Sequence, residues 1–186
     1  MITFNWKKRL VTPTQLSLVK KTALAKNKTI VYTAGAWDML HVGQVRYLHE
    51  AKKLADILVV GVSSNQTVST LKGPNRPILD ELIRAEMLSY LRFVDLVTII
   101  PQMSSQPTIA ALQPDIFVTV KEAWNEGYQD SPEYKTVLKN GGQVKLIERQ
   151  SPFISTTQIL KKGASAQLND ILKDFLDHGQ KPLKDK

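Results

Sequence analysis

The sequence has 186 residues, of which 42% are hydrophobic and 23% are charged. This length and composition are typical of a single soluble globular domain with a core of its own. Cysteine is absent, which excludes disulfides, thiolate chemistry and zinc sites built on cysteine. No apolar run approaches the roughly 18 residues of a membrane-spanning helix, so we expect a cytoplasmic protein without a membrane partner.

The formal net charge of +8 is unevenly distributed along the chain. Residues 1–28 hold seven Lys or Arg and no Asp or Glu, whereas residues 29–160 are close to neutral. Such a basic flank is compatible with steering of an anionic ligand, with nucleic-acid contact or with a solvated surface. We favour the solvated surface and expect no nucleic-acid partner. The basic segment 7–9 lacks the apolar stretch that follows in a secretory targeting peptide, so we expect no targeting peptide but an ordinary leader helix over 15–25.

Strands and helices are expected to alternate along the chain. The leader helix over 15–25 precedes five β-branched or aliphatic runs, which occupy 29–32, 57–62, 96–100, 116–120 and 144–147. Their continuous apolar character is typical of strands buried on both faces of a parallel sheet. The apolar spacing between these runs predicts helices over 42–54, 79–94, 108–112 and 133–140.

This alternation predicts an α/β fold, namely a Rossmann-like doubly wound parallel five-stranded sheet with flanking helices. Gly- and Pro-containing stretches at 73–77 and 126–132 predict loops between the elements. We expect residues 1–162 to form the main domain, including the leader helix. Residues 163–186 are expected to add a C-terminal amphipathic helix and a basic tail.

Two short stretches carry most of the functional information. The first is TAGAWDMLHVGQ at 33–44, which follows a predicted strand and begins a predicted helix; the second is ISTTQI at 154–159. The first places a glycine turn, a histidine and a glutamine at the carboxyl end of a strand. Free N–H groups at a helix start favour a phosphate there, and open α/β sheets bind their ligands at that edge.

His41 and Gln44 are three residues apart, so both are expected on the first turn of the helix, on adjacent positions. The small Gly43 between them allows a ligand to approach the backbone. A histidine at this place can donate to a phosphate oxygen and stabilise the charge that grows during phosphoryl-type transfer. Taken alone, the pattern is more typical of a helix start that binds no ligand.

Further motifs, which follow in a fixed order, favour a phosphate site over a helix start without a ligand. After Gly35, Asp38, His41 and Gly43 come the stretch LKGPNRP at 71–77, then Arg84, and finally STT at 155–157. From about residue 14 to residue 162, this ordered set resembles the cytidylyltransferase-like nucleotidyltransferase superfamily. The stretch at 71–77 favours its heptose 1-phosphate adenylyltransferase branch, the nucleotidyl domain of ADP-heptose synthases.

The resemblance implies a reaction without a covalent enzyme intermediate. A phosphate oxygen of the acceptor attacks the α-phosphate of a nucleoside triphosphate and pyrophosphate leaves, so catalysis rests on positioning and charge stabilisation. The expected partners are ATP and a phosphorylated small-molecule acceptor, a sugar phosphate similar to heptose 1-phosphate. Mg²⁺ is expected as a cofactor held mainly by the nucleotide phosphates, without a dedicated protein metal site.

The resemblance also implies roles for individual residues. His41, Gln44 and Lys72 are the expected catalytic residues. The expected nucleotide-binding residues are Thr33, Ala34, Gly35, Trp37, Asp38, His41, Gly43, Arg76, Arg84, Trp124, Ser155, Thr156 and Thr157. Four groups have a structural alternative: Asp38 as a turn carboxylate, Lys72 and Arg76 as residues of a solvated loop, Trp124 as a packing residue, and the STT run as a plain helix cap.

Two departures from the family pattern bear on activity. Gln44 stands where the family has a second signature histidine, and its amide donates a hydrogen bond but carries no positive charge. After the strand at 116–120 the sequence reads KEAW, where the heptose branch has a glycine-rich run. Two alternatives therefore stay open, a catalytically weak nucleotide-binding homologue that acts as a sensor or interaction protein, and a CTP-dependent cytidylyltransferase. A homodimer also stays open.

Overall fold

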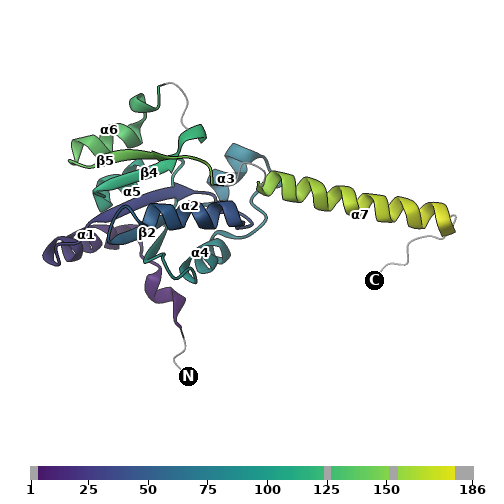
Figure 1. Ribbon diagram of the computed structural model, residues 1–186, viewed down its shortest axis with the longest axis horizontal. Helices are drawn as coiled ribbons and strands as arrows, with labels where there is room; N and C mark the ends of the chain where they lie inside the picture. The colour runs from purple at the N-terminus through teal and green to yellow at the C-terminus, as the bar shows by residue number, and fades with distance from the viewer. Residues whose placement is uncertain (1–3, 124–126, 151–154, 179–186) are drawn as a thin grey trace.

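A computed structural model describes residues 4–123, 127–150 and 155–178. Its centre is a five-stranded sheet in which every described pairing is parallel, with the strand order β3-β2-β1-β4-β5 (Figure 1). The strands are β1 (Ile30–Gly35), β2 (Ile57–Ser63), β3 (Leu96–Ile100), β4 (Ile116–Val120) and β5 (Gln143–Ile147). The predicted doubly wound, Rossmann-like α/β fold is confirmed, and each strand overlaps its predicted apolar run, although β1 extends three residues beyond the predicted end at 32.

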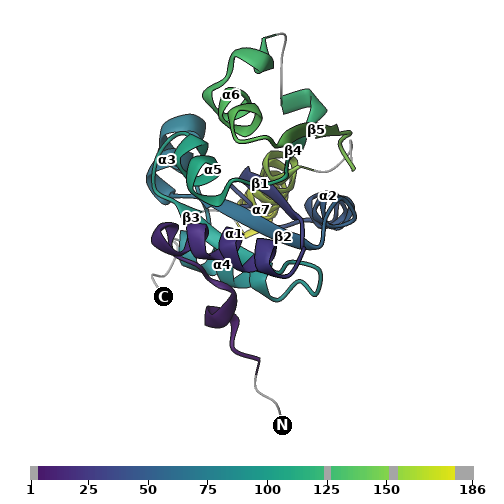
Figure 2. The same ribbon diagram turned by 90° about the vertical axis from the view of Figure 1, so that its left-hand side faces the viewer.

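Helices cover both faces of the sheet. They are α1 (Leu16–Ala25), α2 (Val42–Lys52), α3 (Asn65–Lys72), α4 (Glu81–Ser89), α5 (Gln106–Leu112), α6 (Pro132–Lys139) and α7 (Thr156–His178). Short 3-10 turns lie at Trp6–Arg9, Pro13–Gln15, Lys121–Ala123 and Tyr128–Asp130. Figure 2 shows α2 and α5 on opposite sides of the sheet. The polar helix α3 was not predicted, and α4 is shorter than the predicted helix over 79–94.

The two faces of the sheet carry separate hydrophobic cores, because successive strand residues point to opposite sides. On one face α2 and α4 pack Leu48 and Leu88 against Val31 of β1. On the other face α1 and α5 pack Leu16 and Ile109 against Ile30 and its neighbours. Burial on both faces explains why the strands read as continuous apolar runs.

The amino ends of the strands are held by a repeated contact. Asp56, Asp95 and Asp115 each lie directly before a strand, and each carboxylate accepts a backbone N–H at the start of the neighbouring strand. Asp115 Oδ2 lies 2.7 Å from the nitrogen of Ile30, and its Oδ1 lies 2.8 Å from Nζ of Lys20. These charge-assisted bonds stabilise the sheet at the edge opposite its carboxyl ends.

The strand order reverses between β1 and β4. From β1 the chain continues to β2 and β3 on one side of β1, whereas β4 and β5 lie on the other side. In an open parallel sheet this reversal leaves a crevice at the carboxyl ends of the two central strands, where ligands bind. The segment after β1 is the TAGAWDMLHVGQ stretch, so the fold places it at this crevice.

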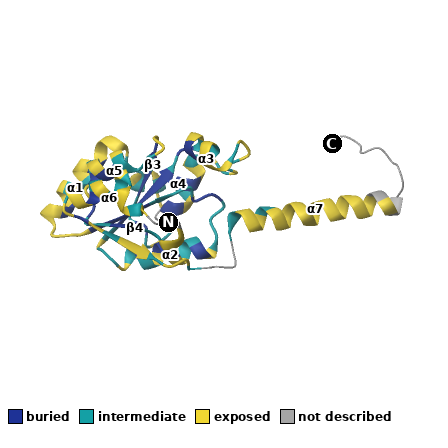
Figure 3. Ribbon diagram, turned by 90° about the horizontal axis from the view of Figure 1, so that it is seen from above, coloured by how far each residue is buried: buried dark blue, intermediate teal, exposed yellow. Residues whose placement is uncertain are grey.

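α7 runs without a break from Thr156 to His178 and projects away from the sheet (Figures 1 and 3). The expected division between residues 162 and 163 therefore falls inside one helix and not between two units. The apolar side chains of Leu168, Ile171 and Leu172 are about half exposed. Within the described residues, no helix combines the length and apolar character that crossing a membrane requires.

We predict that Asp115→Ala lowers the free energy of unfolding by about 1.5–3 kcal/mol, because the amide of Ile30 then loses a charged hydrogen-bond acceptor. Urea denaturation measures the change. Lys20→Met is the control: it removes only the ion pair and keeps the apolar stem, and it should cost less than about 1 kcal/mol. Equal losses in both variants would contradict the importance of the strand contact.

Candidate functional site

A cavity of ≈ 550 Å³ opens at the carboxyl ends of β1 and β4, and we call it the first cavity. Twelve residues that the sequence predicted for the site line it: Ala34, Gly35, Trp37, Asp38, His41, Gly43, Gln44, Lys72, Arg76, Ser155, Thr156 and Thr157. They come from β1, the loop between β1 and α2, α2 itself, α3, the loop after α3, and the start of α7 with the residue before it. Tertiary structure thus brings together most of a site that is scattered along the sequence.

The loop between β1 and α2 has an unusual backbone. Trp37 and Met39, on either side of Asp38, have positive φ angles of 51° and 48°, a region that L-residues rarely adopt. Trp37 is held there by its indole N–H, which donates to the carbonyl of Gly61 at 2.8 Å. A Cβ on Gly35 would lie 3.1 Å from the Trp37 ring, so the glycine permits this close packing. Trp37 thus supports the cavity wall from the core.

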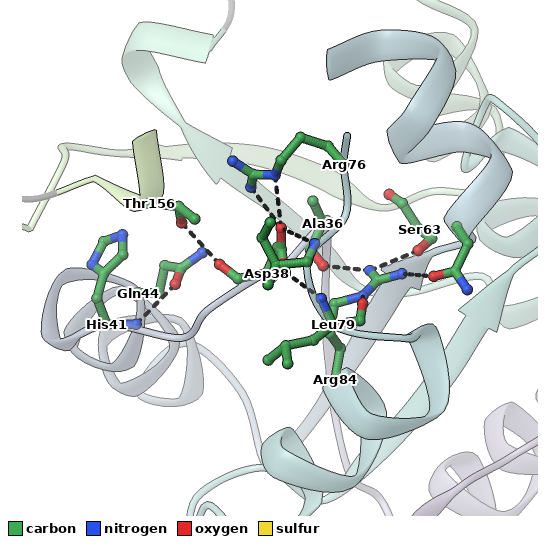
Figure 4. Close-up of polar contacts among 11 residues, drawn as sticks. Ala36, Asp38, His41, Gln44, Ser63, Arg76, Leu79, Arg84 and Thr156 are labelled. Atoms are coloured by element: carbon green, nitrogen blue, oxygen red, sulfur yellow. Dashed lines mark hydrogen bonds and ion pairs between the residues drawn. The ribbon is translucent and has the colours of Figure 1, made fainter. Parts of the chain in front are cut away.

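Asp38 is the centre of the site (Figure 4). Its carboxylate is 1% exposed and accepts from the guanidinium of Arg76 and from the backbone N–H groups of Ile78 and Leu79, at 2.7 to 3.0 Å. Its backbone carbonyl accepts from Thr156 Oγ1 at 2.8 Å. Asp38 therefore joins the loop after α3 and the start of α7 to the loop after β1, which is the structural role left open by the sequence.

Arg84 lies elsewhere than the sequence predicted. The expectation was a phosphate-binding arginine, but the residue is 0% exposed and does not line the first cavity. Its guanidinium donates to four protein acceptors, the carbonyls of Leu79, Ala36 and Ser63 and the side chain of Asn65. Arg84 cross-links the segments behind the site, on the opposite side of Asp38 from Arg76 (Figure 4).

Gln44 has a fixed orientation. His41 is the N-terminal cap of α2, and Oε1 of Gln44 accepts the backbone N–H of His41 at 3.0 Å. Because the amide oxygen is committed to this capping contact, the amide NH₂ is the part left for a ligand in the first cavity. Within the described part of the chain, the NH₂ group donates to no protein acceptor. Gln44 therefore presents a neutral donor where the family pattern has an imidazole.

His41 presents a second neutral group. Burial, with a smaller contribution from the charge of Arg149, lowers the pKa of His41 below its ordinary value near 6.5. Its Nδ1 is buried and lacks a hydrogen-bonding partner among the described residues. Above its lowered pKa the ring is neutral and has one N–H to donate.

Positive charge in the first cavity comes from three other side chains. Lys72, Arg76 and Arg149 line it, against the single carboxylate of Asp38. Partial burial and the nearby guanidinium of Arg76 lower the pKa of Lys72, which is the signature of cations gathered at one place. The surplus of cations makes the cavity suited to a polyanion.

The STT run caps α7, which is one of the two roles expected for it. Ser155 Oγ accepts the backbone N–H of Gln158 at 3.2 Å, and Thr156 begins the helix. The first N–H groups of a helix lack intrahelical partners and favour an anion. Because Ser155, Thr156 and Thr157 also line the first cavity, capping and phosphate contact are compatible here.

Besides Arg84, two predicted residues are absent from the described lining of the first cavity. Thr33 is 1% exposed and shares a hydrogen bond of 2.8 Å with the hydroxyl of Tyr47, behind the cavity wall. Trp124 lies outside the described residues. For Thr33 the side chain thus has a packing role, holding α2 to β1.

Several lining residues were missed from the sequence: Ala36, Tyr47, Thr119, Val120, Arg149 and Gln150. Arg149 is the most informative, because it adds a charge to the site. Its signal was available, since it follows β5 and the carboxyl ends of parallel strands meet at one edge. Thr119 and Val120 end β4 and follow from the same rule.

Protein groups for a metal are sparse. Among the described residues, no group of three or more His, Asp or Glu side chains could hold a metal ion. The carboxylate of Asp38 already accepts three donors. A metal at this site would depend on ligands from the substrate.

Comparison with known proteins identifies relatives. Residues 32–162 match the sequence model of the family described as Cytidylyltransferase-like. The Bifunctional protein HldE of Trichlorobacter lovleyi is 36% identical over 150 residues, which are 79% of this chain and 29% of that protein. The protein of the same name from Campylobacter fetus is 47% identical over 91 residues, 49% of this chain and 20% of that one. This chain thus spans less than a third of these relatives.

A solved structure is also similar. The lipopolysaccharide core biosynthesis protein of Thermoplasma volcanium superposes with a TM-score of 0.55 at 29% sequence identity. The similarity covers 66% of this chain and 96% of that protein. The fold is therefore shared over about two thirds of the present chain, and about a third lies outside the similarity.

We predict that Asp38→Ala lowers the free energy of unfolding by about 3–5 kcal/mol, because it leaves the buried guanidinium of Arg76 and two amides without their acceptor. Chemical denaturation measures the loss. Asp38→Asn is the matched variant, and it should lose less because one acceptor oxygen stays. A loss below about 1 kcal/mol for Asp38→Ala would contradict the central role of this carboxylate.

Proposed function

The chain belongs to the cytidylyltransferase-like family, and from this premise we propose that this nucleotidyltransferase-like domain moves AMP from ATP to a sugar phosphate similar to heptose 1-phosphate. The observation that carries the proposal is the convergence of two helix starts, α2 and α7, with three cations at the β1–β4 crevice. N–H groups at helix starts and surplus positive charge together suit a triphosphate.

The chemistry needs no covalent enzyme intermediate. A phosphate oxygen of the acceptor forms a bond to the α-phosphorus of ATP, while the bond from that phosphorus to the bridging oxygen breaks and pyrophosphate departs with the electron pair. Lys72 and Arg149 are placed to offset the negative charge of the triphosphate. His41 and Gln44 donate neutral hydrogen bonds that orient it. The protein thus works by positioning and preorganised electrostatics.

We expect Mg²⁺ to enter with the triphosphate, because Mg²⁺ in such sites takes many of its ligands from phosphate and water. Asp38, the one carboxylate in the described lining, already accepts from Arg76 and from two amides. When bound, the ion would neutralise phosphate charge and favour departure of pyrophosphate.

Two observations favour a second candidate, a nucleotide-binding homologue with weak catalysis that acts as a sensor or interaction protein. Gln44 replaces a group that can carry charge, and Arg76 is paired with Asp38. We nevertheless favour the enzyme, because His41, Lys72, Arg149 and the STT run remain together in one cavity. ATP is preferred over CTP on the resemblance of residues 71–77 to the adenylyl branch.

We predict pyrophosphate release from ATP, and less from CTP, in the presence of a heptose 1-phosphate and Mg²⁺. ATP should also raise the melting temperature more than CTP does. A ligand at about 100 times its dissociation constant stabilises the fold by roughly 2.7 kcal/mol, which a thermal-shift assay resolves. Stronger protection by CTP would remove the adenylyl assignment. Nucleotide binding without pyrophosphate release from any tested acceptor would favour the sensor.

We predict that His41→Ala lowers kcat by about 10²–10³-fold, the usual effect of removing one donor to developing charge. The melting temperature should hardly change, because the cap of α2 uses the backbone N–H of His41 and not its ring. Steady-state pyrophosphate release and thermal denaturation measure the two effects. A large loss of stability with unchanged turnover would assign His41 a structural role instead.

Two substitutions of Gln44 distinguish its capping contact with His41 from the proposed contact of its NH₂ group with the triphosphate. Gln44→Glu keeps an oxygen for the N–H of His41, so we predict an unchanged melting temperature, but the carboxylate should repel the triphosphate and weaken ATP binding. Gln44→His removes the amide acceptor, at a cost of about 1 kcal/mol in stability, and should raise kcat by adding a group that can carry charge. Calorimetric unfolding and ATP titration provide the measurements.

ATP binding by Gln44→Glu as tight as in the wild type would show that the amide NH₂ does not face the phosphates. Failure of Gln44→His to raise kcat would mean that other departures, such as the KEAW segment, also limit the reaction.

A further inference from the structure

A second cavity of ≈ 460 Å³ lies beside the first, on the side of α3. It is open to solvent and is lined by Asn65, Gln66, Ser69, Arg76, Pro77 and Asp80. These residues come from one face of α3 and from the loop that Asp38 holds in place. The second cavity is therefore built on the same supports as the first, but it is not part of the site described above.

Arg76 lines both cavities. Its Nε and one terminal nitrogen contact Oδ2 of Asp38, at 2.8 and 2.7 Å. A guanidinium carries five N–H donors, so donors remain for a ligand after these two contacts. An anionic group that binds to them would lie at the border between the two cavities.

Apart from Pro77, the remaining lining of the second cavity is polar, and it includes one carboxylate, Asp80. Asn65 and Asp80 are bonded to each other, and Asp80 also caps α4 through the N–H of Leu82. The side chains of Gln66 and Ser69 form no hydrogen bond to other described residues, so an amide and a hydroxyl are available. Pro77 is the one apolar residue of this lining, and no aromatic ring is present there.

This chemistry suits hydroxyl groups better than a nucleobase. A base is held by aromatic or apolar surfaces on which its ring stacks, and the described lining of the second cavity has no aromatic ring and only Pro77 as an apolar residue. Amide and hydroxyl side chains donate to and accept from sugar hydroxyls. A sugar with one phosphate would match the free amide and hydroxyl on α3 and the guanidinium at the border.

The placement also agrees with the geometry of transfer. In such reactions the attacking and leaving oxygens lie on opposite sides of the phosphorus. With the triphosphate in the first cavity, against the starts of α2 and α7, a phosphate held by Arg76 approaches from the side of α3. We propose that the second cavity is the acceptor subsite and holds the polyhydroxylated part of a sugar phosphate, with its phosphate at Arg76. This inference rests on the proposed function.

The test is the binding of three sugar phosphates, heptose 1-phosphate, mannose 1-phosphate and ribose 5-phosphate, by titration calorimetry. Inorganic phosphate is the probe that lacks the sugar, and α,β-methylene-ATP is the nucleotide probe that does not react. We expect at least one sugar phosphate to bind at least tenfold more tightly than inorganic phosphate. Ser69→Leu should weaken that binding at least tenfold, because leucine fills the cavity and removes the hydroxyl.

The same variant should leave the affinities for inorganic phosphate and α,β-methylene-ATP within twofold of the wild type. Thr70→Leu is the matched control, since Thr70 is exposed on the same helix and lines neither cavity as described. It should bind every probe as the wild type does. Leucine is a good helix former, so both variants should fold, and their melting temperatures verify this.

The outcomes separate the two proposals. No sugar phosphate binding better than inorganic phosphate, or unchanged binding by Ser69→Leu, overturns the acceptor subsite while leaving the nucleotide site intact. An equal loss of α,β-methylene-ATP affinity in Ser69→Leu would assign the second cavity to the nucleotide and also overturn it. Absence of α,β-methylene-ATP binding by the wild type would instead overturn the proposed function itself.

Discussion

The buried carboxylate of Asp38 is the contact on which the candidate site depends. It accepts from the guanidinium of Arg76 and from two amides of the loop after α3, and its carbonyl holds the start of α7. A buried charge is tolerated only when it is paired and fully hydrogen-bonded. The same bonds that satisfy the carboxylate therefore fix three separate segments around one cavity. Arg84 strengthens this arrangement from behind by bonding to three backbone carbonyls.

The polar side chains that line the first cavity include both neutral and charged groups. His41, whose pKa is lowered, and Gln44, whose amide oxygen accepts the backbone N–H of His41, are the neutral groups. Lys72 and Arg149 supply charge from other elements. Neutral donors orient a phosphate with little cost of burial, whereas cations offset its charge. In the proposed function, these neutral and charged groups would together hold the triphosphate without the second imidazole of the family pattern.

Differences between the predicted and observed elements have local causes. The strands were predicted because burial on both faces requires continuous apolar runs. Helix α3 was not predicted because its residues are mostly polar and only two of them, Thr67 and Val68, are buried. The C-terminal helix was divided in the prediction at Gly163, but no neighbouring atom crowds that glycine and the helix continues through it. Short-range signals thus located elements better than their ends.

The sequence by itself determined the strand positions, the α/β class and the set of phosphate-directed motifs, because apolar periodicity and helix starts are local properties. Only the tertiary structure decided which motif residues line the first cavity. Arg84 reads as a phosphate ligand in the sequence, yet its partners lie up to 48 residues away and bury it. Asp38 meets Thr156 across 118 residues, and Arg149 joins the site through the strand order. Burial and charge pairing depend on such distant neighbours, which no local pattern specifies.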